Sequence, residues 1–141
     1  MASQGGFLID KSAAARLFRA QPFEEWGGIL EQGRIGVCAP TEFEILYSAR
    51  SHAEYTETKE TLRDLYGWYP VPDDGWRRLL ELHEKLAAGG QHRAAGMADL
   101  LVAVTAMHHR LTLLHYDHDF ETIARHSDLE TRWLAEPGSL D

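Results

Sequence analysis

Four acidic residues lie where helices or strands are expected to begin or end: Asp10, Glu44, Asp99 and Asp117. Asp10 closes the apolar run 7–9, and Asp117 ends the apolar run 111–116. Acids at strand ends and helix starts can meet at the carboxyl edge of a parallel sheet, even when they are far apart in sequence. Converging carboxylates repel one another unless a divalent cation lies among them, and oxygen-only ligands favour Mg²⁺ or Mn²⁺. The pattern is typical of a nuclease-like metal site.

Asp99 is the acid that a purely structural role explains least well. It begins an apolar helix-like stretch and shares a helix face with Val102, Ala103 and Ala106, which we expect in the core. A buried, unpaired carboxylate costs several kcal/mol, so it needs a metal, a basic partner or a helix N-terminus. A surface position in the first helical turn is the alternative.

Asp10 and Ser12 compete for one structural role. Either residue is able to cap the helix that follows the first strand. If Ser12 is the cap, Asp10 is left for another task, and the serine hydroxyl can donate to the carboxylate and hold its rotamer.

Glu42 and Glu44 form an ambiguous pair near the start of a helix that Pro40 and Thr41 open. Acids at either position interact favourably with the helix dipole, so spacing alone does not choose between them. Their side chains point about 200° apart, so both cannot reach one cation. We expect the helix to bury one side that carries three large apolar residues, which places Glu44 at the margin of the buried face: Phe43, Leu46 and Tyr47.

Asp117 and Asp119 alternate around His118 directly after an apolar run. One can bind metal while the other caps the next helix, or both can be turn residues. The nearby histidines suggest zinc, but they lack the spaced His or Cys partners of a zinc site, so we assign them structural or surface roles. These histidines are His108, His109, His115 and His118.

Hydrophobic periodicity and turn residues predict the elements that must position these acids. Strands or extended segments are expected at 7–10, 34–39, 69–72, 111–116 and 129–134. Helices are expected at 12–20, 23–32, about 40–51, 54–66, 74–88, 98–109 and 119–125, with Pro22 as a break and 136–141 as a frayed tail. Strands that alternate with helices predict an α/β three-layer sandwich with a central, mostly parallel sheet. Without repeats or a linker, residues 1–141 are expected to form one domain.

Composition excludes several classes of protein. The chain has 141 residues, of which 44% are hydrophobic and 26% charged, as in a globular domain. The net charge of −8 argues against nucleic-acid binding by bulk attraction, although a cation at an acidic site neutralises part of it. The single cysteine, Cys38, cannot form an intramolecular disulfide. Neither a run of about 20 apolar residues nor a secretory signal pattern occurs, so we expect a cytoplasmic location without a membrane segment.

Four segments together resemble the PIN-domain ribonucleases of the VapC toxin type. The segments run from Phe7 to Ser12, from Pro40 to Arg50, from Ala98 to Ala103 and from Leu113 to Phe120: FLIDKS, PTEFEILYSAR, ADLLVA and LLHYDHDF. Each segment alone is weakly specific, but all four in this order over nearly the whole chain are strongly specific. Lys11 and His115 depart from the family, which usually has threonine at both positions.

The resemblance implies a set of roles. The implied metal ligands are Asp10, Asp99, Asp117 and the more variable Asp119. The implied catalytic acids are Asp10, Glu44, Asp99 and Asp117. Ser12 is implied as the residue whose hydroxyl supports Asp10. Glu44 matches better than Glu42, because the family's acid is followed by an apolar residue and leucine. Lys11, Arg50 and Arg93 are our candidates for binding substrate phosphates. The implied protein is a Mg²⁺- or Mn²⁺-dependent endoribonuclease toxin that cleaves tRNA or rRNA, forms a homodimer and binds an antitoxin.

Two other functions compete with this reading. A non-catalytic PIN-like module for RNA binding or scaffolding is the main alternative, and such modules typically lack one or more of the acids. A metal phosphohydrolase of another fold, suggested by His118 and Asp119, would need further paired histidines on helices.

Overall fold

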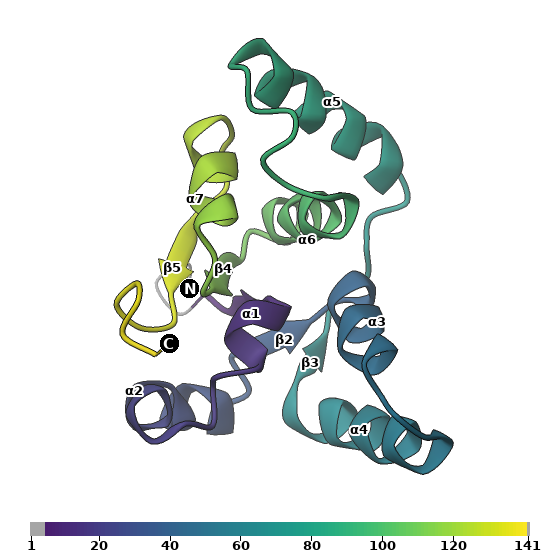
Figure 1. Ribbon diagram of the computed structural model, residues 1–141, viewed down its shortest axis with the longest axis vertical. Helices are drawn as coiled ribbons and strands as arrows, with labels where there is room; N and C mark the ends of the chain where they lie inside the picture. The colour runs from purple at the N-terminus through teal and green to yellow at the C-terminus, as the bar shows by residue number, and fades with distance from the viewer. Residues whose placement is uncertain (1–4, 141) are drawn as a thin grey trace.

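The computed structural model describes residues 5–140, and its central feature is one all-parallel sheet with the strand order β3-β2-β1-β4-β5 (Figure 1). The strands are β1 (Phe7–Ile9), β2 (Ile35–Val37), β3 (Gly67–Trp68), β4 (Thr112–His115) and β5 (Thr131–Trp133). Phe7 pairs with Ile35 on one side and with Thr112 on the other, so β1 is the central strand. All strands therefore end at the same edge of the sheet.

Helices cover both faces of the sheet. They are α1 (Lys11–Ala14), α2 (Ala20–Glu31), α3 (Ala39–Tyr47), α4 (His52–Leu65), α5 (Gly75–Ala88), α6 (Met97–His108) and α7 (His118–Arg125). Figure 1 shows α5, α6 and α7 on one side and α1, α2 and α4 on the other. The strand side chains alternate between two cores, because successive residues of a strand point to opposite faces. Leu8 packs in the core under α5 and α6, whereas Phe7 and Ile9 pack with α2 and α4. The predicted three-layer α/β sandwich is confirmed.

The boundaries near the first crossover differ from the prediction. Asp10, not Ser12, is the N-cap of α1, and its side chain accepts a hydrogen bond from the amide of Ser12. Pro22 does not break a helix but lies in the first turn of α2, where a missing amide hydrogen is tolerated. The third strand is Gly67–Trp68, earlier than the expected 69–72, although the Tyr69 amide still donates to the Val37 carbonyl at 3.0 Å.

The C-terminal segment up to Leu140 is hydrogen-bonded to the rest of the fold and is not frayed as predicted. The Leu140 amide donates to the Tyr116 hydroxyl at 2.9 Å, and the Leu140 carbonyl accepts a hydrogen bond from Arg19. Asp141 lies outside the described residues. Among residues 5–140, none of the helices combines the length and apolarity that crossing a membrane requires.

Candidate metal centre

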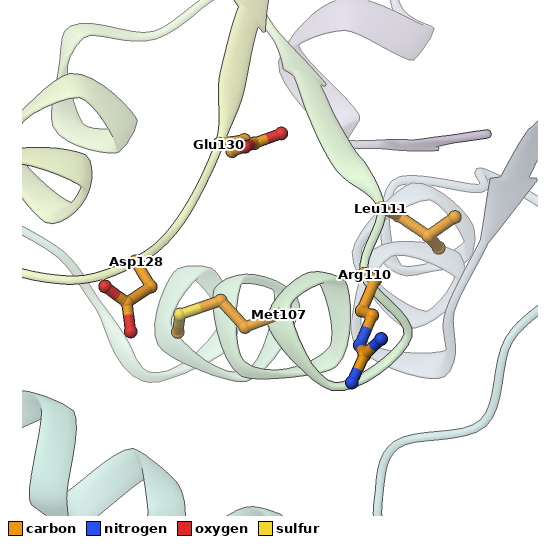
Figure 2. A pocket seen from close by; sticks show the side chains of 5 residues that line it. All are labelled: Met107, Arg110, Leu111, Asp128 and Glu130. Carbon is orange, nitrogen blue, oxygen red and sulfur yellow. The ribbon is translucent and has the colours of Figure 1, made fainter. Parts of the chain in front are cut away.

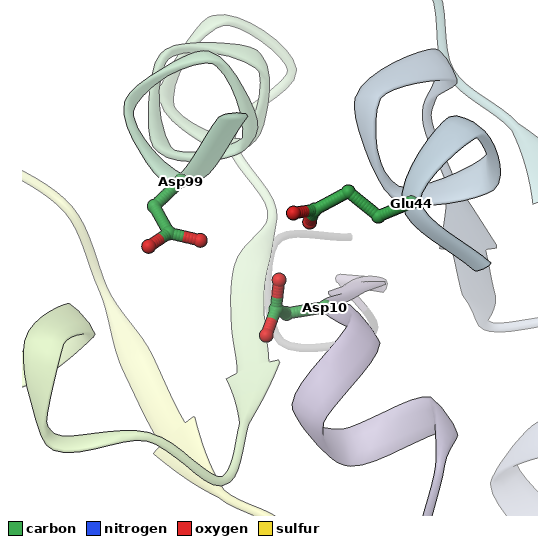
Figure 3. Close-up of side chains that lie close together, drawn as sticks. All are labelled: Asp10, Glu44 and Asp99. Carbon is green, nitrogen blue, oxygen red and sulfur yellow. The ribbon is translucent and has the colours of Figure 1, made fainter. Parts of the chain in front are cut away.

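Three carboxylates from distant parts of the chain meet at the carboxyl edge of the sheet. Asp10 follows the last residue of β1, Glu44 lies in α3, and Asp99 lies in the first turn of α6. One oxygen of each lies within 4.8 Å of those of the other two, and the side chains converge on a common space (Figure 3). This is the one group of three or more candidate metal ligands found among the described residues. A space enclosed by three carboxylates suits a hard divalent cation.

Among the three acids, Asp10 carries the clearest sign of a cation site. Its side chain is buried, with 3% of the residue exposed. Oδ2 accepts hydrogen bonds from the Ser12 amide at 2.9 Å and from the Ser12 hydroxyl at 2.6 Å. Oδ1 is buried as well, yet it has no hydrogen-bond partner among the described residues. A buried carboxylate oxygen without a partner is costly, so the geometry fits a cation at Oδ1.

Ser12 connects the two strands that border the site. The same Oγ that donates to Asp10 also accepts a hydrogen bond from the Tyr116 amide at 2.9 Å. The expected hydroxyl contact to Asp10 is therefore present, and it also fixes the backbone just after β4.

The structure separates Glu42 from Glu44. Glu42 is buried on the α4 side of α3, where its Oε1 lies 3.3 Å from Arg63 Nε. Glu44 instead points toward Asp10 and Asp99 (Figure 3). A paired Glu42 needs no cation, so Glu44 is the acid of this helix that is available to one.

The prediction of the buried face of α3 was wrong for two of its three residues. Leu46 is buried, but Phe43 is 66% and Tyr47 81% exposed. Thr41 and Glu42 take their place in the interior, because α4 supplies Arg63 as a partner for the Glu42 carboxylate.

Asp99 lies in a strongly negative environment. Its pKa is raised from 3.8 to about 7, first by burial and then, in decreasing order of importance, by the charges of Asp10, Glu44, Asp117 and Asp119. Its place in the first turn of α6 only partly offsets this repulsion. In the absence of a cation, Asp99 is thus partly protonated at neutral pH. A divalent cation would stabilise its charged form.

Asp117 and Asp119 flank the trio without joining it. Asp117 is the N-cap of α7, and its Oδ1 accepts a hydrogen bond from the Asp119 amide at 2.9 Å. Burial, and then the charge of Asp117, raise the pKa of Asp119. Both acids act on the pKa of Asp99, which places them at the rim of the same negative region.

His115 is a fully buried residue of this region whose contacts the sequence did not reveal. Its Nδ1 lies 3.1 Å from the Asp117 amide nitrogen, and its Nε2 lies 2.8 Å from Glu121 Oε2. Burial lowers the pKa of His115, so the ring is neutral at physiological pH. The sequence signal was a histidine in an otherwise apolar strand.

The three candidate phosphate-binding cations are exposed and lie on different elements. Lys11 directly follows Asp10; Arg50 lies 3.6 Å from Glu54 at the start of α4; and Arg93 is in the loop between α5 and α6. Sequence reasoning missed Arg16, whose guanidinium donates to the Ser12 carbonyl at 2.8 Å and lies 4.8 Å from the centre of the Tyr116 ring. Arg16 thus adds positive charge next to Ser12, the residue whose hydroxyl binds Asp10.

A cavity lies away from the acids, at the opposite edge of the sheet. It has a volume of about 410 Å³ and is lined by Met107, Arg110, Leu111, Asp128 and Glu130. Its charged side chains come from different segments and do not converge (Figure 2). It therefore lacks the features of a metal site.

Comparison with known proteins relates most of the chain to one family. The family model described as PIN domain matches residues 7–126. Ribonuclease VapC21 of Mycobacterium tuberculosis is 34% identical over 133 residues, which cover 94% of this chain and 96% of that protein. Ribonuclease VapC18 of the same organism is 31% identical over 136 residues, which cover 95% and 98%.

Solved structures show the same fold. The DNA-bound VapBC from Salmonella typhimurium aligns with a TM-score of 0.75 at 14% identity, over 93% of this chain and 99% of that chain. VapBC-5 from Mycobacterium tuberculosis, a member of the VapBC family of toxin-antitoxin systems, aligns with a TM-score of 0.61 at 25% identity, over 92% and 97%.

Proposed function

Because this chain belongs to the PIN-domain family, and within it to the VapC ribonucleases, we propose that it is a metal-dependent endoribonuclease and the toxin of a type II toxin-antitoxin system. The family resemblance expected from the four sequence segments is thereby confirmed. The proposed reaction is hydrolysis of phosphodiester bonds in RNA, with tRNA or rRNA as the substrate class.

The observation that carries the assignment of the site is the unpartnered Oδ1 of Asp10 beside Glu44 and Asp99. A protein that used these acids only for stability would pair them, as it pairs Glu42 with Arg63. Instead, burial and the repulsion among these acids raise the pKa of Asp99, and a bound cation would lower that pKa again. Mg²⁺ is the proposed cation and Mn²⁺ the second candidate, since all the ligands are carboxylate oxygens.

A bound divalent cation would lower the pKa of a coordinated water and offset negative charge on the scissile phosphate. Asp10 and Asp99 would hold it, with Asp117 and Asp119 as direct or water-mediated ligands. Glu44 would orient the attacking water or accept its proton, because among the described residues its carboxylate forms no ion pair with a basic side chain. Ser12 would keep Asp10 in its rotamer through two hydrogen bonds.

Binding of the RNA backbone would need local positive charge, because the chain as a whole carries a net charge of −8. Lys11, Arg50 and Arg93 are the proposed phosphate contacts. Lys11 is the best-supported candidate of the three, because it adjoins Asp10 in the chain and its side chain is exposed.

We further propose a cognate antitoxin, a homodimer and a cytoplasmic location. The antitoxin is supported by the VapBC complexes among the structural relatives and by the acidic site, which would attract a basic peptide. Exposed apolar side chains such as Phe43 and Trp76, 66% and 57% exposed, leave surface for a second protein chain. A cytoplasmic location would place the protein with its proposed RNA substrates.

The main alternative, a non-catalytic PIN-like module, is less well supported. Such a module has no need of an intact acidic trio, and here Asp10, Glu44 and Asp99 meet within 4.8 Å. The histidine-dependent phosphohydrolase is not supported, since the ring centroids of His118 and Trp133 lie 4.9 Å apart and His118 joins no ligand group among the described residues.

Cleavage of structured RNA by the purified protein, with Mg²⁺, Mn²⁺ or EDTA, tests the proposal. We expect cutting with either ion and none with EDTA. Asp10→Asn should be inactive, whereas Asp128→Asn, the same change at the opposite edge of the sheet, should cleave like the wild type. Equal cutting in EDTA, or an active Asp10→Asn variant, would overturn the mechanism.

A further inference from the structure

His115 uses both ring nitrogens inside the protein. A backbone amide can only donate, so the Asp117 amide donates to Nδ1, at 3.1 Å. Nε2 therefore carries the proton of the neutral ring and donates to Glu121 Oε2, at 2.8 Å. The two contacts select one tautomer and one ring orientation.

Glu121 is itself anchored. The same Oε2 accepts a hydrogen bond from the Thr131 hydroxyl at 2.7 Å. The ring of His115 also packs against Phe120 and Trp133, with centroid distances of 5.4 and 4.7 Å. His115 thus connects β4, α7 and β5, and its orientation is fixed from three sides.

The turn between β4 and α7 depends on side chains for its shape. The amides of Tyr116, Asp117 and Asp119 each donate to a side chain rather than to a carbonyl. The acceptors are, in that order, Ser12 Oγ, His115 Nδ1 and Asp117 Oδ1. Two of these acceptors precede the turn, and together they set the direction in which the Asp117 carboxylate leaves the backbone.

We propose that His115 is a positioning residue, whose Nδ1 holds the Asp117 backbone so that the carboxylates of Asp117 and Asp119 face the metal centre. The proposal rests on the proposed function, because it gives this turn a role in binding the cation. A histidine that served packing alone would need only its ring faces, whereas here the backbone of the acid itself is bound.

Two substitutions separate the two ring nitrogens. In the same rotamer, the amide oxygen of asparagine takes the place of Nδ1, whereas the amide nitrogen of glutamine takes the place of Nε2. His115→Asn keeps an acceptor for the Asp117 amide and loses the donor to Glu121. His115→Gln keeps the donor to Glu121 and loses the acceptor for the Asp117 amide. Both remove the aromatic contacts, so loss of packing affects the two variants alike.

Mn²⁺ binding, followed by electron paramagnetic resonance, is the main readout. Supporting groups around metal ligands typically contribute about 10- to 100-fold to affinity, so His115→Gln should bind Mn²⁺ at least about tenfold more weakly, and His115→Asn should stay within about threefold of the wild type. Equal weakening in both variants, with equal losses of melting temperature, would overturn the proposal in favour of packing.

A double-mutant cycle tests whether the effect passes through Asp117. In the Asp117→Asn background, His115→Gln should weaken Mn²⁺ binding clearly less than it does in the wild type, because residues that act through one another are not additive. An undiminished additional loss in that background would also overturn the proposal.

Hydrogen exchange of the Asp117 amide, measured by NMR, is independent of the metal. The amide should be protected in the wild type and in His115→Asn, and exchange faster in His115→Gln. If the wild type binds no Mn²⁺, the proposed function fails, and the exchange result alone decides whether His115 holds the turn. Equal protection in all three proteins would refute the positioning role itself.

Discussion

Asp99→Asn should stabilise the metal-free protein. In the folded state the pKa of Asp99 is raised from 3.8 to about 7 by burial and by the neighbouring acids. As the pH rises above about 4, the unfolded chain loses this proton first, so the native state is progressively destabilised until about pH 7. Above that pH the penalty is constant. A shift of about three units corresponds to an upper limit of about 4 kcal/mol.

The realised gain is smaller than this limit. Solvent screens a partly exposed carboxylate, and the substitution also removes a favourable charge in the first turn of α6, worth about 0.3–1 kcal/mol. We therefore expect a gain of roughly 1–3 kcal/mol at pH 8, or a rise in melting temperature of about 3–9 °C for a domain of this size.

Thermal melts in EDTA at pH 5 and pH 8 measure this effect. The difference between Asp99→Asn and the wild type should be less than half as large at pH 5, because the penalty has only begun to develop there. With Mg²⁺ at pH 8 the wild type should gain stability and the variant should not, so the difference shrinks or reverses. An Asp99→Asn protein that melts below the wild type in EDTA at pH 8 would show that Asp99 has a stabilising partner, and would refute the repulsion argument.

Three further experiments test other parts of the centre. Glu44→Gln should lower the cleavage rate at saturating Mg²⁺ by at least about tenfold. Glu42→Gln should cleave normally but lose up to about 1 kcal/mol of stability, because it weakens the contact with Arg63. The reverse pattern in cleavage assays would mean that the wrong acid was assigned. Ser12→Ala leaves the Tyr116 amide without its acceptor, so urea denaturation should show a loss of about 1–3 kcal/mol, and Ser12→Thr should restore most of it. Saturating Mg²⁺ should raise the melting temperature of the wild type but not of Asp10→Asn; equal shifts in both proteins would place the cation elsewhere.

The sequence predicted the alternation of strands and helices because each buried strand is an apolar run followed by a polar turn. Leu113 and Leu114, for example, are both fully buried on opposite faces of the sheet, as a continuous apolar run indicates. The third strand was misplaced because it has only two residues, Gly67 and Trp68, both exposed at the edge of the sheet. An exposed edge strand carries no hydrophobic pattern.

The candidate site was predicted from its acids, but the reasons for choosing among them were not all available. Glu42 is buried because Arg63, 21 positions later, pairs with it, and a contact between two helices leaves no trace in local spacing. The role of His115 depends in the same way on Glu121 and on the Asp117 backbone. Sequence patterns indicate which residues are chemically able to act, whereas tertiary contacts decide which of them are already satisfied.

The central place of β1 in the sheet has a consequence for when the protein acquires its chemistry. Asp10 directly follows β1, but β4, which completes the pairing of β1, is formed by residues 112–115 and is made much later. Asp99 is likewise made long after Asp10. A domain of this topology folds as a unit once its late strands are present. The acidic centre therefore forms only after β4 has been made, and a nascent chain that stops short of β4 lacks it.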